Sequence, residues 1–196
     1  MEPIILASDS LRRQEFFKLM GLPFSVMPSK FDESQVDHTD GEVYTRELAV
    51  KKVEKVIKDL AKRLPMWICG ADTVVVADGK IFEKPGSREE AASMLKELAG
   101  KQHKVITSVA LYNSLEKKMD SITSICKVSF ASLSDAEIEW YLDTNEWQGV
   151  AGAYRIQGLG SCFINRIEGC PNTVVGLPLH DFYVMLRNNG YPYGAQ

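Results

Sequence analysis

The feature that most constrains the fold is a long amphipathic segment followed at once by an apolar one. From Glu42 to Leu64, apolar residues recur at helical spacing with Lys and Glu between them, and Pro65 ends the pattern. The next residues, 66–77, are rich in β-branched and apolar side chains, which is typical of a buried strand. Because a helix with one apolar face has to cover a neighbouring element, the chain is expected to fold as helices packed on a sheet.

The other segments alternate between strand and helix patterns. The expected strands are 3–7, 24–27, 66–77, 81–82, 103–113, 122–130 and 162–167, and the expected helices are 11–20, 42–64, 87–98, 134–142 and 179–186. Ser87 and Ser134 each precede a glutamate by three residues, the pattern of a helix capping box. Residues 30–42 and 149–160 show little periodicity and are expected to be loops. This alternation predicts a mixed α/β fold.

Composition limits the classes of partner. With 196 residues, 45% of them hydrophobic, the chain is expected to form one compact unit with a cleft. The net charge of −3 argues against a broad basic surface for nucleic acid or anionic lipid, so an anionic ligand has to meet a local basic cluster. No run approaches the roughly 18 apolar residues of a membrane span, and no signal-peptide pattern appears. The four cysteines lack CxxC spacing and are expected to be reduced, so we expect a cytoplasmic protein.

The turn at residues 8–13 breaks a local rule, because Arg12 and Arg13 fall in the first turn of a predicted helix. The positive end of the helix dipole disfavours a cation there by about 0.3–1 kcal/mol. A bound phosphate resolves the conflict, since it accepts from both arginines, the free backbone N–H groups and the hydroxyls of Ser8 and Ser10. The alternative is that Ser10 only caps the helix and both arginines point into solvent or to surface acids. The pattern alone does not decide between the two.

Two further segments place charged residues where they need a role. Asp72 lies inside the apolar run GADTVVV, and a lone buried carboxylate costs several kcal/mol unless it is paired or coordinated. Its alternative is an aspartate at a strand end that is satisfied by backbone N–H groups. In Glu83-Lys84-Pro85 the proline fixes a turn, and Lys84 is either functional or simply solvated.

The remaining candidates concern metal ions. Asp32 and Glu33 offer the hard oxygen ligands that Mg²⁺ prefers, although such a pair is more often a solvated loop. The three histidines, His38, His103 and His180, are isolated, so the sequence gives no support for a zinc site. No GxxxxGK[ST] phosphate loop and no GxSxG motif occurs.

Four motifs occur in order along the chain: ILASDSLRR, GADTVVV followed by FEKP, AGAYRIQGLG and NTVVGLPL. In their order and spacing, from Ile4 to Leu186, they resemble the Maf family of nucleoside triphosphate pyrophosphatases. This resemblance implies an elongated fold related to the inosine triphosphate pyrophosphatases, in which helices flank a twisted mixed sheet and a cleft separates two lobes of a single domain, 1–196. It also implies hydrolysis between the α and β phosphates, with a nucleoside monophosphate and pyrophosphate as products.

The resemblance also assigns roles to individual residues. Asp72 is implied as the proton acceptor that activates water, and Arg12, Thr73 and Gln157 as the residues that govern base choice. The remaining cleft positions are implied to hold phosphates or a divalent cation, Mg²⁺ or Mn²⁺: phosphate ligands Ser8, Ser10, Arg13, Lys52 and Lys84, metal ligands Glu33 and Asp72, and the further cleft residue Glu83.

ADT together with IQG resembles the branch of the family that prefers dTTP and UTP, so a pyrimidine nucleotide is the expected substrate and a homodimer the implied assembly. Two positions depart from the family pattern. Leu11 stands where a proline is usual, and Val150 stands where many members have a lysine, which removes a cation near Gln157. The alternatives are a nucleotide-binding regulator of cell division without catalysis, and a purine pyrophosphatase acting on ITP or XTP.

Overall fold

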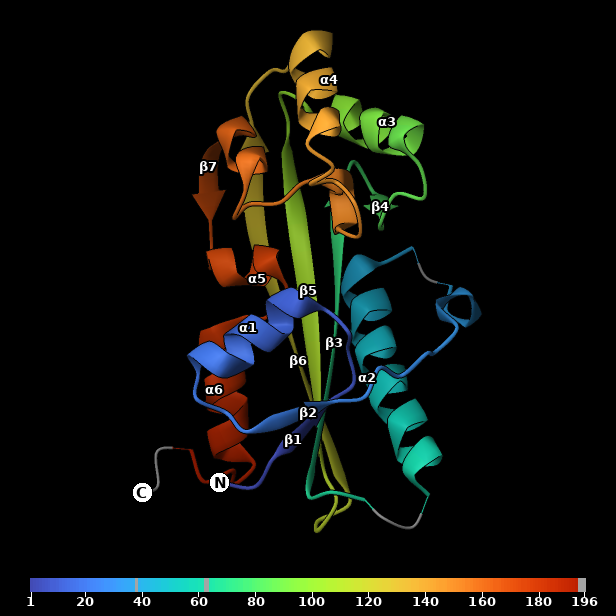
Figure 1. Ribbon diagram of the computed structural model, residues 1–196, viewed down its shortest axis with the longest axis vertical. Helices are drawn as coiled ribbons and strands as arrows, with labels where there is room; N and C mark the ends of the chain where they lie inside the picture. The colour runs from blue at the N-terminus through green and yellow to red at the C-terminus, as the bar shows by residue number, and fades with distance from the viewer. Residues whose placement is uncertain (38, 62–63, 194–196) are drawn as a thin grey trace.

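The computed structural model describes residues 1–37, 39–61 and 64–193, and Figure 1 shows an elongated molecule built along one sheet. Its strands are β1 (Ile4–Leu6), β2 (Phe24–Val26), β3 (Trp67–Ala77), β4 (Lys80–Phe82), β5 (Gln102–Asn113), β6 (Lys118–Phe130) and β7 (Ile164–Glu168). Its α-helices are α1 (Leu11–Leu19), α2 (Gly41–Leu60), α3 (Arg88–Leu98), α4 (Asp135–Asp143), α5 (Pro171–Val175) and α6 (Leu179–Asn188), and its short 3₁₀ helices are η1 (Glu33–Gln35), η2 (Ala151–Ala153) and η3 (Leu159–Phe163).

In the described residues the strands form one mixed sheet in the order β2-β1-β3-β5-β6-β7, with β4 also paired to β3. The long strands β3, β5 and β6 are antiparallel neighbours, whereas β1 runs parallel to both β2 and β3. β1 pairs with β3 only over residues 67–69, and β4 pairs with β3 only over residues 75–77. Residues 70–74 of β3 therefore lie along a gap in one edge of the sheet.

Helix α2 covers one face of the sheet and confirms the strongest sequence prediction. Asp40 caps the helix by accepting from the N–H groups of Glu42 and Val43. A β-carbon on Gly70 would lie 2.7 Å from the carbonyl oxygen of Ala49, so the absence of a side chain in β3 lets the helix approach closely. The tight packing of α2 on β3 thus depends on a glycine.

The opposite face of the sheet carries two apolar cores. Figure 1 shows the helices that cover them, with α1 and α6 toward one end of the molecule and α3 and α4 toward the other. Toward one end, α1 and α6 pack on Trp67, Cys69 and Ala71 of β3. Toward the other end, α3 and α4 pack on Val75 and Ala77 of the same strand. The gap in the sheet edge falls between the two cores.

Several sequence predictions need correction at their boundaries. The last strand begins at Ile164 rather than at residue 162, because residues 159–163 form the 3₁₀ helix η3. The predicted loop 149–160 contains η2, whose Gly152 has a φ of 66° and donates its N–H to the carbonyl of Glu83. Helix α5 was not predicted, because five residues are too few for a periodic signal.

Other predictions are confirmed or fall outside the described residues. Ser87 and Ser134 both cap their helices, and Ser134 forms the complete capping box with Glu137. His38 of the predicted loop and residues 62–63 of the predicted helix 42–64 lie outside the described part of the chain. Within the described part, no helix is both long and apolar enough to cross a lipid bilayer.

Candidate functional site

A cavity of about 520 Å³ lies beside the gap in the edge of β3. The turn after β1, the middle of β3, the inner face of α2 and residues 148–157 all contribute to its wall. Of the eleven residues to which the family resemblance assigns a place in the cleft, ten line it: Ser8, Ser10, Arg12, Arg13, Glu33, Lys52, Asp72, Thr73, Lys84 and Gln157. The exception is Glu83. The fold thus brings together residues that are up to 149 positions apart in the sequence, while their individual roles stay predictions.

The wall of the cavity holds an ion triad of Lys52, Asp72 and Glu33. The Lys52 ammonium lies 2.7 Å from Asp72 Oδ1 and 2.9 Å from Glu33 Oε1. Lys52 and Asp72 are buried, whereas the Glu33 side chain is 41% exposed. Lys52 belongs to the inner face of α2, so its position in the helical period places a cation against the sheet. Asp72 is therefore paired with Lys52, and this pairing offsets the cost of burying a carboxylate in an apolar strand.

Arg13 ties the turn after β1 to two other segments. Its guanidinium donates to Ser8 Oγ at 3.1 Å, to Thr73 Oγ1 at 3.1 Å and to the carbonyl of Gly176 at 2.9 Å. Burial lowers the pKa of Arg13, and the charge of Asp72 opposes that effect. Because three of its donors are already used within the protein, Arg13 fixes the geometry of the turn as well as lining the cavity.

Thr73 has a defined hydrogen-bonding direction. Thr107 donates its hydroxyl hydrogen to the carbonyl of Thr173 at 2.7 Å, so its oxygen accepts from the hydroxyl of Thr73 at 2.9 Å. Thr73 also accepts from Arg13. With its only hydrogen donated to Thr107, the Thr73 hydroxyl offers a ligand an acceptor and no donor.

Arg12 also lines the cavity and is more exposed than Arg13. Its guanidinium donates to the carbonyl of Gly149 at 3.4 Å. Burial, together with the nearby positive charges of Arg155 and Arg13, lowers the pKa of Arg12 to about 10. A basic cluster of this kind favours an anionic ligand.

The other predicted residues take distinct places. Ser10 is the N-cap residue of α1 but makes no side-chain capping bond, so the interpretation that it merely caps the helix is wrong. Lys84 and Gln157 are exposed and line the cavity. Glu83 does not line the cavity; instead, its carboxylate accepts from the hydroxyl of Tyr44 on α2, and its carbonyl accepts from Gly152.

Two residues near the site were missed from sequence, Arg155 and Tyr44. Arg155 lines the cavity, although only the glutamine of its motif, Gln157, was predicted to have a role. Tyr44 had a visible signal, since it lies on the inner face of α2 one turn from its start. Val150, where a lysine is usual in the family, is buried in the wall, so Arg155 is the cation that this segment supplies.

The candidate metal ligands in the cavity are Glu33 and Asp72, whereas the loop pattern had offered Asp32 and Glu33. Asp32 Oδ1 accepts from the backbone N–H and the hydroxyl of Ser34, and these bonds lower the pKa of Asp32. Only Glu33 of the pair lines the cavity, where it meets Asp72 through Lys52. Among the described residues no cluster of three or more acidic, His or Cys side chains is arranged to hold a metal. Two carboxylates nevertheless fit Mg²⁺, which takes one or two of them together with phosphates and water.

The mixed sheet and the cavity at its edge define an α/β protein with a polar ligand cleft that carries both acidic and basic groups. The chain belongs to the Maf-like protein family, whose model matches residues 3–189. The match covers all four sequence motifs.

Individual relatives extend over almost the whole chain. The dTTP/UTP pyrophosphatase of Pelotomaculum thermopropionicum is 41% identical over 191 residues, which cover 97% of this chain and 98% of that protein. The dTTP/UTP pyrophosphatase of Escherichia coli is 39% identical over 188 residues, covering 96% and 93%. The nucleoside triphosphate pyrophosphatase of a Synechococcus strain is 38% identical over 191 residues, covering 97% and 96%. The Ham1 protein of Staphylococcus aureus aligns at 16% identity and a TM-score of 0.47, covering 66% of this chain and 72% of its own.

Proposed function

We propose that this protein is a nucleoside triphosphate pyrophosphatase that hydrolyses dTTP and UTP between the α and β phosphates. The relatives that match nearly the whole chain at about 40% identity carry that name. The observation that carries the proposal is the pairing of Asp72 with Lys52 in the wall of a cavity that Arg12 and Arg13 also line.

The chemistry of this arrangement suits attack on a polyanion. A water molecule that binds to Asp72 loses a proton to the carboxylate as its oxygen bonds to phosphorus and the bridging P–O bond breaks. Lys52 and the arginines neutralise the charge of the phosphates, which otherwise repels the attacking oxygen. A divalent cation, Mg²⁺ or Mn²⁺, would be held by Glu33 and Asp72 together with the substrate, and it would supply further charge neutralisation.

The first experiment measures pyrophosphate release from dTTP in the presence of Mg²⁺. We expect turnover by the wild type and a loss of about 100-fold or more in Asp72→Asn, the range for a removed general base. Asp78→Asn is the matched control, because this substitution makes the same chemical change at an exposed position in the turn that follows the same strand. Absence of pyrophosphate with wild type, or equal turnover in Asp72→Asn, overturns the proposal.

Base choice follows from the hydrogen-bonding direction of Thr73. Thymine and uracil both carry an N–H donor at N3, which suits an acceptor-only hydroxyl, whereas cytosine carries an acceptor at N3. We therefore expect dTTP and UTP to be hydrolysed faster than CTP. Thr73→Val removes the acceptor and should raise KM for dTTP about tenfold. The ratio of kcat/KM for dTTP to kcat/KM for CTP should therefore fall. An unchanged dTTP to CTP ratio in this variant contradicts the assignment.

The same substrate panel separates the alternative functions. A strong preference for ITP over dTTP indicates a purine pyrophosphatase, and tight nucleotide binding without turnover indicates a regulator. We also propose a cytoplasmic location, supported by four cysteines that are all free thiols. A homodimer is a further prediction, and sedimentation of the purified protein tests it.

A further inference from the structure

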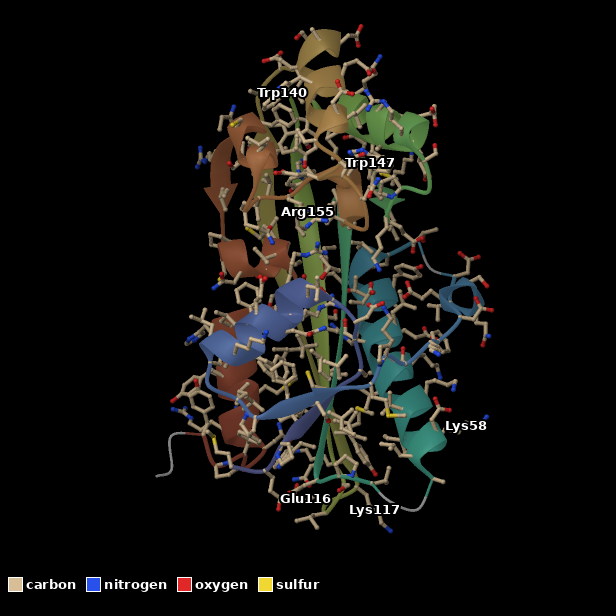
Figure 2. The ribbon with its side chains drawn as sticks, viewed as in Figure 1. Lys58, Glu116, Lys117, Trp140, Trp147 and Arg155 are labelled. Atoms are coloured by element: carbon tan, nitrogen blue, oxygen red, sulfur yellow. The ribbon has the colours of Figure 1, made fainter. Side chains whose placement is uncertain are left out.

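Arg155 is a cavity residue for which neither the sequence motifs nor the proposed reaction has given a role. It follows η2, between the segments that carry Val150 and Gln157. Figure 2 shows its side chain in the middle of the molecule, between α1 and the end that holds α3 and α4. Its Nε donates to the carbonyl of Glu146 at 2.6 Å, and its Nη2 donates to the carbonyl of Gln148 at 2.9 Å. Among the described residues, Nη1 has no hydrogen-bond partner.

Arg12 reaches the same stretch of backbone from a different element. Its Nη2 donates to the carbonyl of Gly149, the residue next to the one that accepts from Arg155. Arg12 comes from the N-terminal turn of α1, whereas Arg155 comes from the segment after η2, and both line the cavity. Two guanidinium groups therefore meet at one wall of the cavity, held by neighbouring carbonyl groups.

No salt bridge neutralises the pair among the described residues. Burial and the repulsion from Arg155 lower the pKa of Arg12, and the charge of Glu15 offsets this effect only in part. Two like charges in a partly buried site are unfavourable unless an anion binds between them. A phosphate oxygen accepts from both guanidinium groups and neutralises them, whereas the carbonyl of a neutral base accepts hydrogen bonds without neutralising charge.

We propose that Arg155 is a phosphate-binding residue that, with Arg12, holds one phosphate group of the nucleotide from two sides. The identity of the ligand as a nucleotide rests on the proposed function; the binding of a phosphate group does not. Arg155 thereby supplies a cation on the segment in which Val150 replaces the usual lysine.

The test measures binding rather than turnover, so it is independent of catalysis. Titration calorimetry measures the dissociation constants of three probes. Inorganic pyrophosphate represents the β and γ phosphates, thymidine monophosphate carries the α phosphate, and thymidine carries the base without a phosphate. In Arg155→Gln, the dissociation constant for pyrophosphate or for thymidine monophosphate should rise about tenfold or more, since a charge-assisted hydrogen bond is lost. The probe that is weakened identifies the phosphate group. Thymidine should bind as it does to the wild type.

Two further variants separate phosphate binding from support of the backbone. Arg166→Gln removes the same charge from an exposed position on β7 and should bind both probes as the wild type does. Arg155→Lys keeps the charge but loses the fork that grips two carbonyl groups, and it should recover at least half of the lost binding free energy.

The inference fails if Arg155→Gln binds both phosphate probes within twofold of the wild type. It also fails if Arg155→Lys is as weak as Arg155→Gln, because the side chain then acts only by holding residues 146–149. Weaker binding of thymidine would make Arg155 a base contact instead. If the wild type binds pyrophosphate but hydrolyses no nucleotide, the proposed function falls and the phosphate site stands.

Discussion

The buried pair of Lys52 and Asp72 allows the energetics of the site to be measured without a substrate. Replacing Lys52 by methionine keeps most of the side-chain volume and leaves the Asp72 carboxylate buried without the cation that forms its salt bridge. Removal of one partner from a buried pair costs about 3–5 kcal/mol. Because Asp72 borders a cavity that admits water, we expect the lower limit, about 3 kcal/mol. For a chain of this length that corresponds to a fall in Tm of about 6–12 °C.

Urea denaturation of four proteins tests this reasoning: the wild type, Lys52→Met, Asp72→Asn and the double variant. The double variant removes both charges, so it should be more stable than Lys52→Met by about 1 kcal/mol or more. The coupling energy from this cycle then measures the pair itself. A loss below about 1 kcal/mol in Lys52→Met, or a double variant less stable than Lys52→Met, refutes the idea that Lys52 compensates a buried charge.

Three further predictions concern residues around the site. Tyr44→Phe removes the hydrogen bond to Glu83 and should lower kcat/KM several-fold with a stability loss of only about 1 kcal/mol, measured by dTTP kinetics and urea denaturation. Gly70→Ala places a β-carbon 2.7 Å from a carbonyl oxygen of α2 and should lower the free energy of unfolding by about 2–3 kcal/mol. In Gly86→Ala the nearest contact of the new β-carbon is at 3.4 Å, so the loss should be under about 1 kcal/mol. Burial lowers the pKa of His103 to about 4, so the unfolded chain binds its proton first and stability falls as the pH drops below about 6.5. The loss at pH 5 relative to pH 7.5 should be about 2 kcal/mol by urea denaturation and should be absent in His103→Gln.

The fold was largely predictable because its main elements carry periodic signals. The apolar face of α2 repeats along 20 residues, and the continuous apolar run of β3 is typical of a strand that is covered on both faces. The 3₁₀ helices and α5 were missed or misplaced because three to five residues do not span enough turns to show a period. Their positions depend on glycine conformation and on contacts with distant segments, such as the bond from Gly152 to Glu83.

Most residues that line the cavity were predictable from the sequence motifs, but the hydrogen bonds between them were not. Asp72 broke the pattern of an apolar strand, and the arginines broke the rule for a helix start, so each carried a local signal. The signal for Lys52 was its place on the inner face of a helix. Arg155 carried no local conflict at all, since its repulsion with Arg12 exists only once the chain has folded. Interactions of this kind lie outside the reach of a single sequence.

The charge distribution explains how an acidic chain can present a site for a polyanion. Three acidic side chains line the cavity, namely Asp9, Glu33 and Asp72, and six basic ones do so, namely Arg12, Arg13, Lys30, Lys52, Lys84 and Arg155. The lining therefore has a formal charge of +3, whereas the whole chain has −3. The potential inside a concave site is set mainly by its own walls, so the surplus of negative charge elsewhere keeps the rest of the surface unattractive to polyanions. Nucleotide binding should consequently weaken with added salt, because at 0.15 M the Debye length is only about 8 Å and the outer cations of the cavity are screened.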